Sequence, residues 1–214
     1  MVQDRDEPRW GPHRDGTGQT VLVNTYPEVI IISRHGEKPE PSIGSLGVDQ
    51  LGRSDPHSLT VVGWQRAGAL AALLAHAPSV AHPDLVRPER VFATKPTSRA
   101  KSRRELDTAR PAADRLGLVI DSSHEHHQVD QLADRILADS RPPLVVWHHG
   151  EIPSLVRALG VDPAEVPATW PEHRYDLLWV LTRKAPSTTS GDGLARYSLE
   201  VVPQRLLAGD AADV

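Results

Sequence analysis

The stretch Val29-Ile-Ile-Ile-Ser-Arg-His-Gly-Glu-Lys-Pro39 carries the strongest structural signal in this chain. Its first four residues are apolar and β-branched, and a continuous run of this kind suits a strand that is buried on both faces. Arg34 and His35 follow at the point where the strand ends, which is where open α/β sheets bind their ligands. Gly36 then allows a sharp turn and a close approach to a ligand. The stretch predicts a site with a nucleophilic histidine and a phosphate-binding arginine.

Composition narrows the class of protein. A chain of 214 residues is long enough for one well-buried domain, and two domains are not expected. A charged fraction of 24% and an apolar fraction of 39% are typical of a globular protein in water. The net charge of -4 argues against general binding to nucleic acid, and the absence of cysteine excludes disulfides and thiolate metal sites. The 11 histidines are compatible with phosphotransfer or with metal binding.

The two ends of the chain differ from its middle. Residues 1–26 are polar and lack the apolar core of a signal peptide, so we expect a disordered or loosely attached segment in which residues 20–23 could add a short edge strand. Residues 27–207 form the predicted domain, and residues 208–214 form a predicted tail. No stretch approaches the ~20 apolar residues of a membrane span. We therefore expect a cytoplasmic protein that does not bind a membrane.

Between these ends, helical and extended patterns alternate, which predicts an α/β fold. Helices are expected at residues 59–76, 102–116, 128–138 and 154–159, with Ser58 or Thr60 and Ser102 as N-caps. Further strands are expected at residues 90–93, 118–120, 144–147, 175–182 and 196–202, the last two as a hairpin at the sheet edge. Residues 40–57 are rich in Pro, Gly, Ser and Asp and predict a long loop that leaves directly from the site.

A second apolar strand has the same construction as the first. Residues 144–147 run into His148-His149-Gly150, and a helix follows. Parallel neighbouring strands would bring this pair of histidines and His35 to one edge of the sheet. Two segments with basic side chains, one at Arg34 and His35 and one at His148 and His149, suit the binding of a phosphate group at this edge.

Taken together, these motifs resemble those of the histidine phosphatase superfamily, the phosphoglycerate-mutase-like proteins. The resemblance rests on the order of Arg34-His35-Gly36, the helix at residues 59–70, Arg104 four residues before Thr108, and His148, and it covers residues 28–202. The form Arg-His-Gly-Glu-Lys-Pro is similar to that of a small bacterial subgroup. The resemblance implies a three-layer α/β/α sandwich with a mainly parallel sheet.

The same resemblance implies a phosphomonoester hydrolase that works through a covalent phosphohistidine on His35 and needs no metal or cofactor. The substrate would be a phosphorylated small molecule or a phosphoprotein. A phosphomutase, or a non-enzymatic domain that binds a phosphorylated ligand on the same fold, is the alternative. Fold by itself does not decide among these functions, and the oligomeric state stays open.

Four positions are expected to act on the phosphate: His35 as nucleophile, with Arg34, Arg104 and His148 around the phosphate oxygens. The two arginines and the second histidine should lower the pKa of His35 and keep its ring neutral. Arg99 or Arg103 could take the place of Arg104. Three residues depart from the common pattern of the superfamily, since Ala100 stands where serine is usual, Glu105 where alanine is usual and His149 where glycine is usual.

The remaining candidates concern the leaving group and the substrate. Glu125 is a candidate general acid, although a solvated loop carboxylate is an equally good interpretation, and Asp121 or His124 are other possibilities. Glu37, Lys38 and His149 are candidate substrate-binding residues. The tract at residues 124–127 could bind a metal, but no metal site is predicted. The basic run at residues 95–104 lacks interleaved aromatic residues, so no nucleic-acid partner is predicted. Trp170, Tyr175 and Trp179 are expected to pack in the core.

Overall fold

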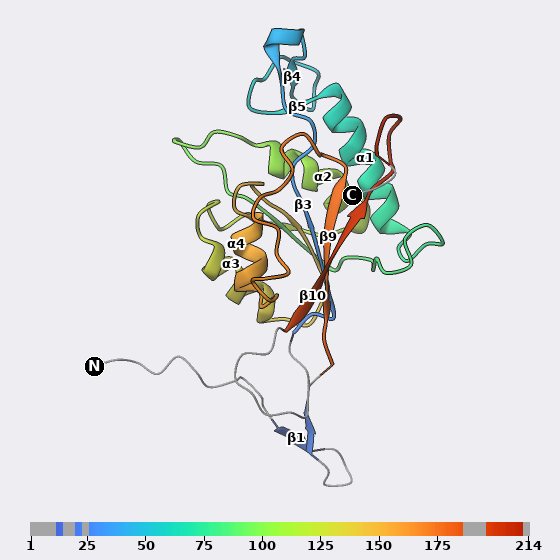
Figure 1. Ribbon diagram of the computed structural model, residues 1–214. Coiled ribbons are helices and arrows are strands. Elements are labelled where there is room, and N and C mark those ends of the chain that lie inside the picture. The colour runs from blue at the N-terminus through green and yellow to red at the C-terminus, as the bar shows by residue number, and fades with distance from the viewer. Residues whose placement is uncertain (1–11, 15–19, 23–25, 186–195, 212–214) are drawn as a thin grey trace, which may run out of the picture.

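A computed structural model describes residues 12–14, 20–22, 26–185 and 196–211, and a six-stranded sheet lies at its centre (Figure 1). The strand order is β10 (Tyr197–Pro203), β9 (Leu177–Arg183), β3 (Val29–Ser33), β8 (Pro143–Val146), β6 (Arg90–Ala93) and β7 (Ile120–Asp121). β3, β8, β6 and β7 are parallel, while β9 is antiparallel to β3 and to β10. The mainly parallel sheet and its edge hairpin are thus confirmed.

Helices cover both faces of the sheet. α1 (Val61–Ala75) and α2 (Arg104–Leu116) pack against one face, and α3 (Val129–Leu137) and α4 (Ile152–Ala158) lie on the other (Figure 1). Alternate residues of β3 enter the two hydrophobic clusters, with Ile30 and Ile32 on the α3 and α4 side and Val29 and Ile31 on the α1 and α2 side. Both faces of β3 are therefore dry, which explains its continuous apolar run and confirms the three-layer architecture.

The helix ends mostly follow the sequence signals. The Thr60 side chain caps α1 by accepting a hydrogen bond from the Gly63 N–H at 3.1 Å. Gly117 ends α2 in the left-handed conformation with a φ of 69°. The predicted cap at Ser102 is wrong by one position, because Arg103 occupies the N-cap of α2 and makes no side-chain cap hydrogen bond. The Ser102 hydroxyl still accepts a 3.4 Å hydrogen bond from the Arg104 N–H.

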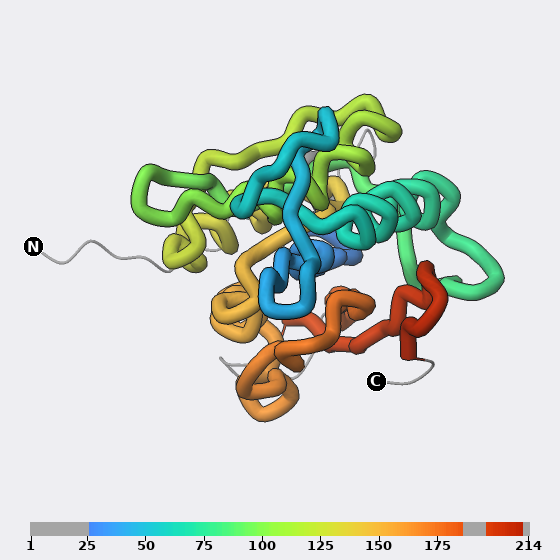
Figure 2. Tube along the Cα trace, turned by 90° about the horizontal axis from the view of Figure 1, so that it is seen from above, coloured from blue at the N-terminus to red at the C-terminus, as the bar shows by residue number. Residues whose placement is uncertain are grey.

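The segment between β3 and α1 is more ordered than a plain loop. It contains a short 3-10 helix, η1 (Pro41–Ile43), and β4 (Gly47–Val48), which pairs with β5 (Leu59–Thr60). Seen from above, this segment lies next to the end of β3, and α1 lies to one side of it (Figure 2). The site at the end of β3 is thus bordered by a structured segment.

The two ends of the chain depart from expectation in different ways. β2 (Thr20–Leu22) pairs with β1 (Pro12–Arg14) in a separate two-stranded sheet, so the expected edge strand at residues 20–23 does not join the central sheet. The beginning of the predicted tail is fixed to the domain, because Asp210 forms an ion pair with Arg66 at 2.7 Å. None of the helices in the described part of the chain has the length and apolar character needed to cross a membrane.

Candidate active site

The carboxyl ends of β3 and β8 lie side by side. Ser33 is opposite Val146 in the parallel register, and the Trp147 N–H donates to the Ser33 carbonyl at 2.9 Å. Both strands end there, so the two histidine segments leave the sheet at the same edge. The ring centroid of His149 lies 6.0 Å from that of His35. The prediction that both segments share one edge is confirmed.

His35 is held as a neutral ring with a defined tautomer. Its side chain is buried, and Nδ1 lies 2.6 Å from the Gly36 carbonyl oxygen. Because a carbonyl only accepts, Nδ1 carries the proton and Nε2 keeps its lone pair. Burial lowers the pKa of His35 to about 3, the Gly36 carbonyl opposes this effect, and the charges of Arg34 and Arg104 add to it. A neutral imidazole of this kind can attack phosphorus.

The turn after His35 is fixed by a close backbone contact with α1. The Gly36 N–H donates to the Thr108 hydroxyl at 2.9 Å, and that hydroxyl donates to the Arg104 carbonyl at 2.8 Å. A Cβ atom at Gly36 would lie 2.9 Å from the Gly63 carbonyl oxygen, and a Cβ at Gly63 would lie 2.8 Å from the Glu37 carbonyl oxygen. Glycine is therefore required at both positions, and the turn packs against α1 and is tied to the start of α2.

Arg34 presents two unfilled donors. Its side chain is buried, Nη1 donates to the Glu172 carbonyl at 2.5 Å, and its guanidinium carbon lies 4.1 Å from the centre of the Tyr175 ring. Nε and Nη2 are buried and have no hydrogen-bond partner among the described residues. Buried donors without a partner are rare and destabilising, and each one needs an explanation. Two adjacent guanidinium N–H groups match the geometry of two phosphate oxygens.

The arginines near the start of α2 occupy different environments. Arg104 is half-buried, and its guanidinium donates to the carbonyl oxygens of Ser58 at 3.2 Å and Pro56 at 2.7 Å. Its charge also acts on the pKa of His35. Arg99 is exposed, and Arg103 is exposed and forms an ion pair with Asp55. Of these three arginines, Arg104 is the half-buried one and the one whose charge acts on the pKa of His35.

The second histidine segment is more open. His148 and His149 are half-buried, and the Nδ1 atom of each is buried without a hydrogen-bond partner in the part of the chain that the structure describes. Their rings lie 4.9 Å apart. Burial and the Arg34 charge lower the pKa of His149 to about 4, while burial and the neighbouring His126 lower the pKa of His148. The rings of His148 and His149 form a wall at the edge of the sheet where His35 lies.

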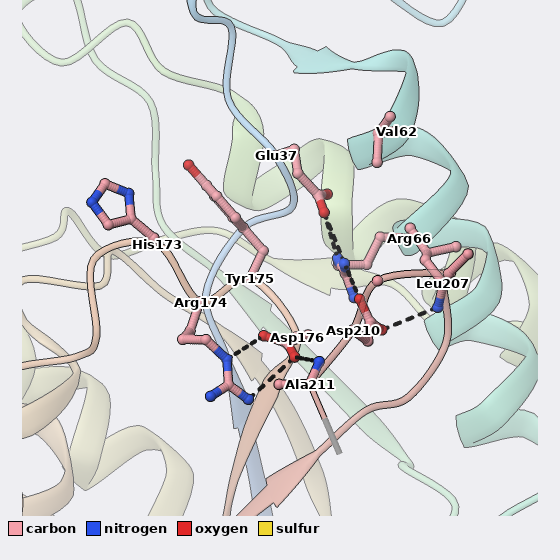
Figure 3. A pocket seen from close by; sticks show the side chains of 12 residues that line it. Glu37, Val62, Arg66, His173, Arg174, Tyr175, Asp176, Leu207, Asp210 and Ala211 are labelled. Carbon is pink, nitrogen blue, oxygen red and sulfur yellow. Dashed lines mark hydrogen bonds and ion pairs between the residues drawn. The ribbon is translucent and has the colours of Figure 1, made fainter. Parts of the chain in front are cut away.

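The candidate substrate-binding residues Glu37 and Lys38 lie differently. Glu37 accepts two hydrogen bonds through Oε1, from Arg66 Nε at 2.9 Å and Arg66 Nη2 at 2.8 Å, and Arg66 in turn pairs with Asp210 (Figure 3). Glu37 also lines a cavity of about 290 Å³ that Tyr175 borders, and its Oε2 is buried without a partner. Lys38 is exposed. Glu37 thus links the turn after His35 to α1 and to the C-terminal segment through Arg66 and Asp210.

Three residues near the site were not identified from the sequence. Tyr175 lies against Arg34 and His35 rather than in the core, whereas Trp170 and Trp179 stack there as expected with ring centroids 5.2 Å apart. Glu105 is buried in the first turn of α2, accepts a 3.3 Å hydrogen bond from Ser102, and has its pKa raised by burial. The sequence signal for Glu105 is that it stands where the superfamily usually has alanine.

The third is His126, whose ring lies 5.5 Å from that of His148. The sequence does not distinguish His126 from the other histidines of the tract at residues 124–127. The candidate acid of that tract, Glu125, has a side chain that is 38% exposed, with its Oε2 4.0 Å from His127 Nδ1. Across the described ranges, no group of three or more His, Asp or Glu side chains is arranged to hold a metal ion.

Comparison with solved structures identifies the fold. SixA from Agrobacterium tumefaciens, described as a candidate phosphohistidine phosphatase, superimposes with a TM-score of 0.51 at 16% identity, covering 83% of this chain and 99% of its own. A mycobacterial glucosyl-3-phosphoglycerate phosphatase, solved with VO3, gives a TM-score of 0.49 at 19% identity, covering 82% and 99%. YhfR of Bacillus stearothermophilus gives 0.42 at 14% identity, covering 80% and 96%. No family model and no curated protein matches the sequence.

Proposed function

We propose that this chain, which has the fold of the phosphoglycerate-mutase-like histidine phosphatases, hydrolyses phosphomonoesters through a covalent phosphohistidine on His35. One observation carries the proposal. A buried histidine with its lone pair on Nε2 stands beside Arg34, whose Nε and Nη2 are buried donors without a partner. The nucleophile and the unfilled anion site are therefore adjacent in the chain and both are fixed in place.

The proposed reaction assigns a role to each group. Arg34 and Arg104 bind non-bridging phosphate oxygens, and His148 adds a further contact, so that negative charge in the transition state meets fixed donors. His35 Nε2 attacks phosphorus, and the N–P bond forms as the bond to the leaving oxygen breaks. Water then attacks the phosphohistidine and releases phosphate. No step uses a metal ion, because the arginines supply the positive charge.

Covalent trapping tests the proposal. Purified protein is mixed with an aryl phosphate labelled in its phosphate group and quenched within milliseconds, and the label is then mapped by peptide analysis. We expect acid-labile label on His35, turnover that survives EDTA, and no label on a His35→Ala variant. Label on another residue, or loss of turnover on chelation with recovery on adding Zn²⁺, contradicts the mechanism. Transfer of the label to a second substrate alcohol rather than to water would identify a phosphomutase.

A further inference from the structure

The turn that carries His126 is fixed to the ends of two strands. The His126 carbonyl accepts a hydrogen bond from Trp147 Nε1 at 3.1 Å, directly after β8. The His124 carbonyl accepts from the Lys95 N–H at 2.8 Å, just beyond β6. The turn itself is closed by Gln128, whose N–H donates to the Glu125 carbonyl at 2.9 Å and whose Oε1 accepts from the Glu125 N–H at 2.8 Å. This turn is therefore a defined part of the site edge.

The ring of His126 faces the phosphate-binding wall. Its centroid lies 5.5 Å from that of His148, and the two rings are tilted by 53°. His148 lies 4.9 Å from His149, which lies 6.0 Å from His35, so each of the four rings lies close to the next. His127 contacts His126 at 5.3 Å, but its own side chain is 63% exposed. Of the two neighbouring histidines, His126 is therefore the half-buried one.

The proposed reaction needs a proton donor at the leaving oxygen. The leaving oxygen lies opposite the attacking His35 in an in-line displacement, on the outer side of the phosphate. Glu105 is buried at the base of α2, where Ser102 holds its carboxyl group, so it does not face outward. Glu125 is more exposed and its nearest charged partner is His127. His126 combines partial burial with contact to a phosphate-binding residue.

We propose that His126 is the general acid of this site, an inference that rests on the proposed phosphatase function. As the N–P bond to His35 forms, the P–O bond breaks and its electron pair stays on the leaving oxygen. That oxygen takes a proton from the His126 ring, which becomes neutral. In the second step, neutral His126 accepts a proton from the attacking water as the N–P bond breaks, and both residues return to their starting states.

The test uses the acidity of the leaving group. An alkyl phosphate releases a strongly basic alkoxide that needs a proton, whereas p-nitrophenyl phosphate releases a stable phenolate that does not. Positioned general acids contribute roughly 10²–10⁴-fold. We therefore expect His126→Gln to lower kcat/KM for glycerol phosphate by about a hundredfold or more, while kcat/KM for p-nitrophenyl phosphate stays within about fivefold of the wild type.

His127→Gln is the matched control, because His127 is the next residue and its side chain is more exposed. It should leave both substrates within about threefold of the wild type. An equal loss on both substrates in His126→Gln, or a selective loss in Glu125→Gln or His127→Gln instead, overturns the assignment of His126. If the wild type turns over neither ester, the phosphatase proposal fails and this inference fails with it.

Discussion

The ends of β3 and β8 share one construction, a buried strand followed by histidine and glycine, yet they differ in burial and in the contacts that hold them. At the β3 end, Arg34 and His35 are buried and the turn is tied to Thr108 and packed under Gly63. At the β8 end, His148 and His149 are half-buried and each has an Nδ1 without a partner. The same construction therefore gives a buried, tightly held His35 at one strand end and a more open wall of His148 and His149 at the other, because the packing around it differs.

The largest expected difference between the two ends is in catalysis. His35→Ala removes the nucleophile and should lower kcat by on the order of 10⁵-fold or more. His148→Ala removes one electrostatic contact and should lower kcat by about 10²–10³-fold. Steady-state kinetics with p-nitrophenyl phosphate measures both, and circular dichroism checks that each variant is folded. If the two variants are equally impaired, the division into nucleophile and wall is wrong.

The second prediction concerns Arg104, the first residue of α2. Lysine cannot reproduce the planar fork of Arg104, so Arg104→Lys should lower kcat/KM by about a hundredfold, or roughly 3 kcal/mol of transition-state stabilisation. Arg103→Lys and Arg99→Lys are the controls, since both side chains are exposed, and they should stay within a few-fold of the wild type. A crippled Arg99→Lys variant would show that a different arginine binds the phosphate.

The third prediction tests the close backbone contact between the turn after His35 and α1. A methyl group at Gly63 would lie 2.8 Å from the Glu37 carbonyl oxygen, so Gly63→Ala should destabilise the protein by about 1–3 kcal/mol. Gly68 lies in the same helix, and a methyl group there would meet no neighbouring element within 4 Å. Gly68→Ala should therefore be neutral or stabilising by up to about 1 kcal/mol. Urea denaturation measures both. Equal stability of the two variants would show that the close contact does not require glycine at position 63.

The smallest expected effect is the pH dependence of stability. The folded pKa of His149 is about 4, below its ordinary unfolded value of about 6.5. Between these values the unfolded state binds more protons, so this contribution to stability is complete above pH 6.5 and is lost as the pH falls toward 4. His149→Asn should therefore lose less unfolding free energy than the wild type between pH 7 and pH 5. His57→Asn, at an exposed position, is the control, and it should follow the wild type.

Much of the fold followed from patterns that are local in the chain. The apolar run of β3 requires burial on both faces, and the alternation of helices and strands specifies layers, so the three-layer sandwich was predictable. The helix at Val61–Ala75, its cap at Thr60 and the C-terminal hairpin were also predicted within a few residues. The pairing of β2 with β1 was not, because a short strand does not specify its partner.

For the site, the amino-acid sequence alone specifies which residue types stand at the strand ends, since a buried strand must stop where polar residues begin. Which of these residues meet depends on the tertiary structure. Register and packing bring His149 to His35, His126 to His148 and Tyr175 to Arg34, across up to 141 residues of chain in the last case. They also tie Glu37 to Arg66 and Asp210. Contacts at such separations depend on the packing of whole elements, which no local pattern encodes.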